Sequence, residues 1–66
     1  MTRLEQALLD FVRTTQRQPV VIYMGWEVLK EVRMSDICYQ LDLANNLYQG
    51  IPWFRVANAD NHLAIY

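Results

Sequence analysis

Cys38, His62 and Asp60 are the residues of this sequence whose types could together support nucleophilic catalysis. In such a site a histidine removes the thiol proton and a carboxylate orients the imidazole. No motif typical of a catalytic nucleophile surrounds Cys38, and His62 lies beside a predicted turn, where histidine is common. We therefore interpret Cys38 as a buried, inert cysteine.

Metal, acid–base and phosphate chemistry find no better support in the sequence. One histidine and one cysteine cannot complete a tetrahedral metal site within one chain. No pair of carboxylates has an apolar setting that would raise a pKa for acid–base catalysis. Gly25 follows a predicted strand as a phosphate-binding glycine would, but it lacks the further glycines of such a loop and is expected only to allow a sharp turn. We therefore expect no catalytic residue, no metal and no cofactor, and predict that the protein is not an enzyme.

Size and composition favour a protein that binds other proteins. The chain has 66 residues, 53% of them hydrophobic, which exceeds the usual share of roughly 45–50% and favours self-association or a partner surface. Its net charge of −1 comes without a basic cluster, which argues against nucleic acid. No apolar run approaches the roughly 20 residues that span a bilayer. A single cysteine allows no intrachain disulfide and suits a reducing compartment, so a cytoplasmic location is expected.

The first predicted element is an amphipathic helix over residues 3–16. Thr2 and Glu5 have the spacing of a capping box. Apolar residues recur at helical spacing after them: Leu4, Ala7, Leu8, Phe11 and Val12. Pro19 disfavours helical geometry at the preceding residue, so the helix should end before it.

The next two elements are a strand over 20–24 and a short helix over 26–34. Residues 20–24 are continuously apolar and lie between Pro19 and Gly25, a pattern typical of a central strand buried on both faces. In the helix, Val28, Leu29 and Val32 should face the core. Trp26 begins this helix on another side, where it could pack over the sheet edge or anchor a partner.

Residues 36–49 fit two periods. Apolar residues alternate over 37–43 as in a strand, yet the longer segment also has one apolar helical face. Gly50 followed by Pro52 is a common helix stop. We favour a helix over 36–49, with a strand over 37–43 as the alternative.

The last fourteen residues predict a β-hairpin of strands 53–57 and 62–66, joined by the turn-forming residues 58–61. Pairing Ala57 with His62 gives one face that resembles a core face, made of Phe54, Val56, Leu63 and Ile65. The other face carries residue types common in interface hot spots: Trp53, Arg55, His62 and Tyr66. These four residues and Trp26 are the predicted partner-binding residues.

Two short motifs resemble those of small uncharacterised phage and prophage proteins. Residues 19–24 fit the pattern P-x-x-I-x-M ahead of the second helix, and residues 48–52 fit Y-x-G-I-P ahead of the terminal hairpin. A similar strand–helix and G-x-P hairpin arrangement occurs in tailed-phage major capsid proteins, whose long spine helix and extended loop this sequence lacks. The resemblance, which covers residues 19–66, implies a phage-type origin and transfers no functional residue.

Together these patterns predict a single α+β domain over residues 1–66. Two to three helices would pack on a small sheet made of the strand at 20–24 and the terminal hairpin. The favoured function is a non-enzymatic interaction or structural protein of phage origin, homo-oligomeric, acting through its sheet edge and outer hairpin face. The alternative is a small phage inhibitor that binds a host protein. The expected location is the cytoplasm, that of the host if the protein is phage-encoded.

Overall fold

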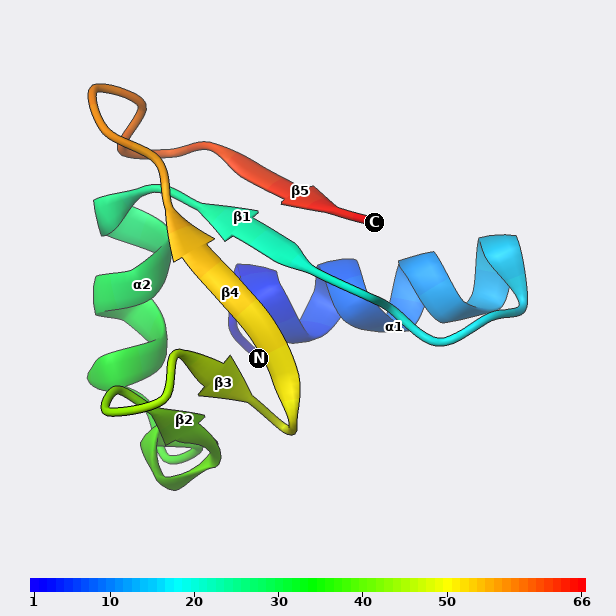
Figure 1. Cartoon of the computed structure of the whole chain (residues 1–66), viewed down its shortest axis with the longest axis horizontal. Helices are drawn as coiled ribbons and strands as arrows, with labels where there is room; N and C mark the ends of the chain where they lie inside the picture. The colour runs from blue at the N-terminus through cyan, green and yellow to red at the C-terminus, as the bar shows by residue number, and fades with distance from the viewer.

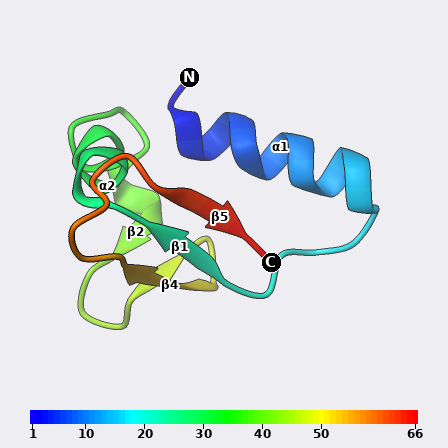
Figure 2. The ribbon, with the colours of Figure 1, turned by 90° about the horizontal axis from the view of Figure 1, so that it is seen from above.

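Two helices cover one face of a five-stranded mixed sheet in the computed structural model, which describes residues 1–66 (Figure 1). In chain order the elements are α1 (Arg3–Thr15), β1 (Ile22–Met24), α2 (Trp26–Arg33), the short 3-10 helix η1 (Cys38–Gln40), β2 (Leu41–Asp42), β3 (Leu47–Tyr48), β4 (Ile51–Arg55) and β5 (Leu63–Ile65). The strand order is β2-β3-β4-β1-β5. The view from above shows both helices on the same side of the strands, which leaves the other side without a covering layer (Figure 2). The α+β class is therefore confirmed.

The capping box at the start of α1 is confirmed. The Thr2 hydroxyl accepts the Glu5 backbone N–H at 3.2 Å, and the Glu5 carboxylate accepts the Thr2 backbone N–H at 2.8 Å. These bonds satisfy donors that the first turn of a helix leaves free. The helix ends where Gln16 adopts a left-handed φ of 55°, within one residue of the predicted end.

Strand β1 is an inner strand of the sheet, next to the edge strand β5, and contrary to the prediction it is not buried on both faces. It pairs parallel with β4 and antiparallel with β5. Ile22 and Met24 point to the helices and are fully buried, whereas Tyr23 points to the uncovered side. The continuous apolar run therefore reflects one core face and one exposed aromatic side chain.

The predicted terminal hairpin is wrong in its pairing, because β1 lies between β4 and β5. Residues 56–62 are long enough to pass over the end of β1, where the Gly25 N–H donates to the His62 carbonyl at 2.8 Å. Pairing with β1 also inverts the faces of β4. Trp53 lies beside Ile22 on the core face, and Phe54 lies beside Tyr23 on the uncovered face.

The favoured helix over 36–49 is also wrong. After η1, residues 41–48 form a small hairpin in which Leu41 pairs with Tyr48. Its turn is closed by Asp42, whose carboxylate accepts the Asn45 side-chain and backbone N–H groups. These two hydrogen bonds lower the pKa of Asp42, because they stabilise the ionised carboxylate. The strand alternative is correct only at Leu41–Asp42.

The core lies between the helices and one face of the sheet. It contains nine buried side chains: Leu4, Leu8, Ile22, Met24, Val28, Leu29, Val32, Tyr48 and Trp53. Tyr48 is the largest fully buried member, and its hydroxyl has no hydrogen-bond partner within the chain. Burial, with smaller contributions from Glu5 and Tyr39, raises the pKa of Tyr48 above its ordinary value of 10.0.

Replacing Tyr48 with phenylalanine is expected to leave the free energy of unfolding at pH 7 unchanged or slightly higher, because the lost hydroxyl has no partner. At high pH the wild type should lose stability relative to this variant. The raised pKa means that the unfolded chain releases the Tyr48 proton at lower pH than the folded protein does. The contribution of neutral, buried Tyr48 to the free energy of unfolding is therefore complete below about pH 10 and is lost as pH rises further. Urea denaturation at pH 7 and pH 10.5 measures the difference.

The matched control is Tyr66→Phe, since Tyr66 is 57% exposed. If Tyr66→Phe and Tyr48→Phe change the alkaline stability equally, burial of Tyr48 is not the cause of the pH dependence.

Candidate functional site

An aromatic row crosses the uncovered face of the sheet. It consists of Phe54 on β4, Tyr23 on β1 and Tyr66, which directly follows β5. The rings of Tyr23 and Phe54 are stacked, and those of Tyr23 and Tyr66 meet edge to face, with 5.8 Å between the centroids in both pairs. These geometries are favourable for aromatic pairs and contribute roughly 0.5–1.5 kcal/mol each. The row is nevertheless exposed, at 49% for Phe54, 37% for Tyr23 and 57% for Tyr66.

The register defines the rest of this face, which we call the open face. Besides Tyr23 and Phe54, the strand residues that alternate away from the helices are Asp42, Leu47, Pro52 and Ala64. None of these strand residues is basic, and one is acidic. The strand residues of the open face therefore combine aromatic and other apolar side chains with one carboxylate, and they carry no positive charge that could bind phosphate groups.

Of the five predicted partner-binding residues, the structure places Tyr66 in the aromatic row. His62 and Arg55 are exposed near the β4–β5 loop. Trp53 is only 6% exposed and belongs to the core, so its assignment to an outer face is wrong. Trp26 is half-buried and packs against the core, which is the packing alternative for this residue.

Tyr23 and Phe54 are the members of the aromatic row that the sequence interpretation placed incorrectly. Tyr23 lay in a run interpreted as buried throughout, and Phe54 was assigned to the core. The signal that could have placed Tyr23 is the alternation of Ile22 and Met24 around a residue with a polar hydroxyl. No comparable signal existed for Phe54, because its face depends on which strand pairs with β4.

The structure does not bring Cys38 and His62, the residues of the possible catalytic site, close together. Cys38 is exposed at the start of η1, so the expectation of a buried cysteine is wrong. Figure 1 places η1 and the β4–β5 loop, which contains His62, at opposite ends of α2. No group of three or more His, Cys, Asp or Glu side chains is arranged to hold a metal ion.

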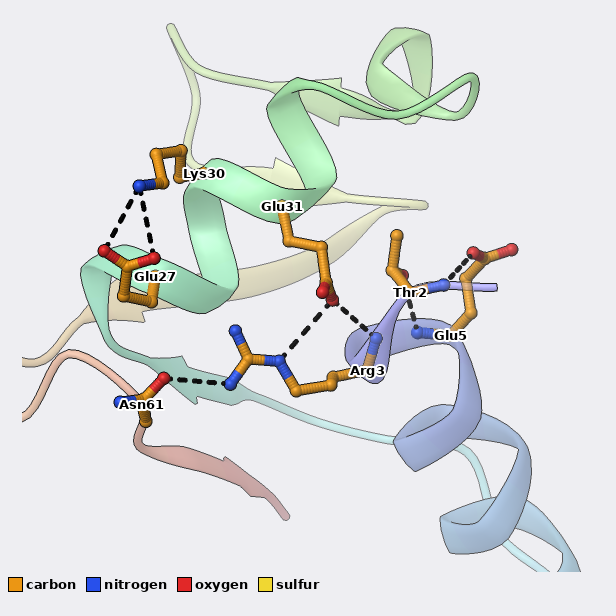
Figure 3. A network of polar contacts seen from close by, with 7 residues as sticks. All are labelled: Thr2, Arg3, Glu5, Glu27, Lys30, Glu31 and Asn61. Atoms are coloured by element: carbon orange, nitrogen blue, oxygen red, sulfur yellow. Dashed lines mark hydrogen bonds and ion pairs between the residues drawn. The ribbon is translucent and has the colours of Figure 1, made fainter.

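A cavity of about 530 Å³ lies between the start of α1 and the end of α2, and three carboxylates line it: Glu5, Glu31 and Asp36. Two of them already have partners. Glu5 caps α1, and Glu31 accepts the Arg3 backbone N–H at 2.7 Å and pairs with the Arg3 guanidinium at 3.6 Å (Figure 3).

The Arg3 guanidinium also donates to the Asn61 side-chain oxygen at 3.0 Å, a contact drawn in Figure 3. Arg3 therefore connects α1 to both α2 and the β4–β5 loop. We interpret this polar network as a contact between elements, and the open face as the stronger candidate for function.

None of the helices has the length and apolar character needed to cross a membrane. No family model, curated protein or solved structure matches this chain. The aromatic row is therefore the basis for assigning a function.

Proposed function

We propose that the chain is a non-enzymatic interaction protein that binds protein partners through the open face of its sheet. The observation that carries this proposal is the aromatic row of Phe54, Tyr23 and Tyr66. Aromatic residues are enriched where interfaces gain most of their binding energy, because they bury large areas at a low cost in conformational entropy. Their mutual contacts favour the observed ring positions before binding, which lowers that cost further.

Charge favours a protein partner over single-stranded nucleic acid. Aromatic side chains on a sheet can stack with bases, but such surfaces combine the rings with a positive groove that follows the phosphates. The strand residues of the open face include no lysine or arginine and include Asp42. A protein surface of mixed apolar and polar character needs no such positive charge.

The proposal extends to the biological setting that the sequence motifs imply. A protein of phage origin, acting in the host cytoplasm, would use the open face to assemble with itself or to bind a host protein. The same surface serves both roles, and the identity of the bound protein distinguishes them.

Phe54→Ser is expected to weaken partner binding about 30-fold, the effect of losing a hot-spot residue worth roughly 2 kcal/mol. The fold should persist, because half of the Phe54 side chain is exposed. The measurement is a pull-down from bacterial lysate in which wild-type and variant baits are compared over a range of bait concentrations.

Leu9→Ser is the matched control, since Leu9 is a similarly exposed apolar residue on the helical layer. It should retain every protein that the wild type captures. Loss of the captured protein with Leu9→Ser, but not with Phe54→Ser, would move the binding surface from the sheet to the helices.

A further inference from the structure

Strand β5 ends the sheet with backbone groups that no strand pairs. Its antiparallel bonds to β1 come from alternate residues: the His62 carbonyl accepts the Gly25 N–H at 2.8 Å, and Tyr66 exchanges bonds of 3.0 and 3.1 Å with Val21. Ala64, opposite Tyr23, continues the same alternation. The N–H and C=O groups of Leu63 and Ile65 consequently point away from β1, toward the free edge.

The two edges of the sheet differ in how they are protected. At the β2 edge the strand has two residues, one of them the charged Asp42, and it turns directly into a tight loop. At the β5 edge Leu63, Ala64 and Ile65 carry neither a charge nor a proline, the features that usually prevent edge pairing. The structure thus leaves one edge able to accept another strand.

We propose that a second copy of this chain pairs antiparallel along β5, about a two-fold axis that passes between the two Ala64 residues. In this register Leu63 lies opposite the partner's Ile65, and Ile65 lies opposite the partner's Leu63. All four free backbone groups of each copy then form hydrogen bonds. A register shifted by two residues would leave some of them unpaired, so this register uses the edge most completely.

Side-chain direction agrees with the same register. Directly opposite residues point to the same face of a sheet, so Ala64 of each copy lies on the open face. Leu63 and Ile65, which pack against the core, meet on the helical face. A shift by one residue would set open-face residues opposite core-face residues.

The paired sheet joins the two open faces into one surface. His62 of each copy would lie opposite the partner's Tyr66, at the end of the aromatic row. The pairing uses the β5 edge, and the inference rests on the proposed function only for the role of the joined surface. The dimer would present two aromatic rows on that surface, one from each copy, to a further protein.

The test is disulfide trapping in the full chain. Ala64→Cys is made in a Cys38→Ser background, because Cys38 is exposed and would otherwise react. Opposed residues of this kind have Cα atoms about 4.5 Å apart, within the range that a disulfide spans. Mild oxidation should convert most of the protein to a covalent dimer of twice the 7.8 kDa chain mass.

The matched control is Ala44→Cys in the same background, an exposed alanine in the β2–β3 turn. It should form at least tenfold less dimer. Equal trapping of both variants would overturn the register. A mass of 7.8 kDa for the unoxidised Cys38→Ser protein at several hundred micromolar would overturn the dimer itself.

A charge pair tests the same register without cysteine. Ala64→Lys alone and Ala64→Glu alone should each be monomeric, because like charges then lie opposite each other, while the equimolar mixture should dimerise. A mixture that stays monomeric would contradict the register even if the cysteine variant failed to fold.

Phe54→Ser separates this inference from the proposed function. Phe54 lies two strands from the paired edge, so this substitution should leave trapping at Ala64 intact. If the Phe54→Ser variant still forms the disulfide at Ala64→Cys and still captures the same proteins as the wild type, the proposed function is wrong and the dimer stands.

Discussion

Replacing Trp53 with alanine is expected to unfold the domain or bring it close to unfolding at room temperature. Trp53 is a buried core residue on β4, and its indole N–H has no hydrogen-bond partner within the chain, so packing is what it contributes. Removing a buried tryptophan costs about 3–5 kcal/mol. A domain of 66 residues has a total stability of roughly 3–10 kcal/mol, so this loss is a large fraction of it.

Phe54→Ala is the matched control, because Phe54 is the next residue on the same strand and points to the open face. Its cost should be about 1 kcal/mol, chiefly from the lost contact with the Tyr23 ring. Thermal melts followed by circular dichroism measure both variants. If Phe54→Ala melts earlier than Trp53→Ala, the faces of β4 are the reverse of those described.

Local signals in the sequence were sufficient for the two helices. The capping box at Thr2 and Glu5 involves residues one turn apart, so neither its geometry nor its energy depends on the rest of the fold. The stripe of Val28, Leu29 and Val32 likewise fixes which side of α2 faces the core.

The β4–β5 pairing could not be predicted in the same way. Two apolar segments separated by a short polar segment satisfy a hairpin pattern whether or not they pair with each other. Here β1 takes the position between them, and the parallel register of Ile22 with Trp53 determines which side of β4 is buried. Trp53 and Phe54 are both large and apolar, so their residue types could not show which of them faces the core.

Residues 36–49 illustrate a second limit. Their apolar residues satisfy both a helical and a strand period, and the hydrogen bonds of Asp42 with Asn45 favour the turn that makes them a hairpin. Predicting the aromatic row would have required the positions of three segments that are far apart in the sequence. Its members come from β1, β4 and the residue after β5, and no local pattern links these segments.

Gly25→Ala is expected to destabilise the protein by about 3 kcal/mol or more, because the new methyl group has no space. A Cβ at Gly25 would lie 1.9 Å from the Ala59 carbonyl oxygen and 2.5 Å from the carbonyl of Asp60. These are backbone atoms that cannot rotate away. The Asp60 carbonyl also accepts the Glu27 N–H at 2.8 Å, so a displaced loop would leave a donor of the first turn of α2 without its partner.

Gly50→Ala is the matched control for the same chemical change. Gly50 has a φ of +80°, and no atom lies within 4 Å of the position its Cβ would occupy. Its cost should be about 1 kcal/mol, from backbone strain alone. Urea denaturation of both variants gives the comparison. Equal losses would mean that the β4–β5 loop does not rest on Gly25, and the path of residues 56–62 over the end of β1 would then be wrong. A much larger loss for Gly25→Ala is expected instead, because the close contact of this loop with Gly25 is what allows β5 to reach the far side of β1.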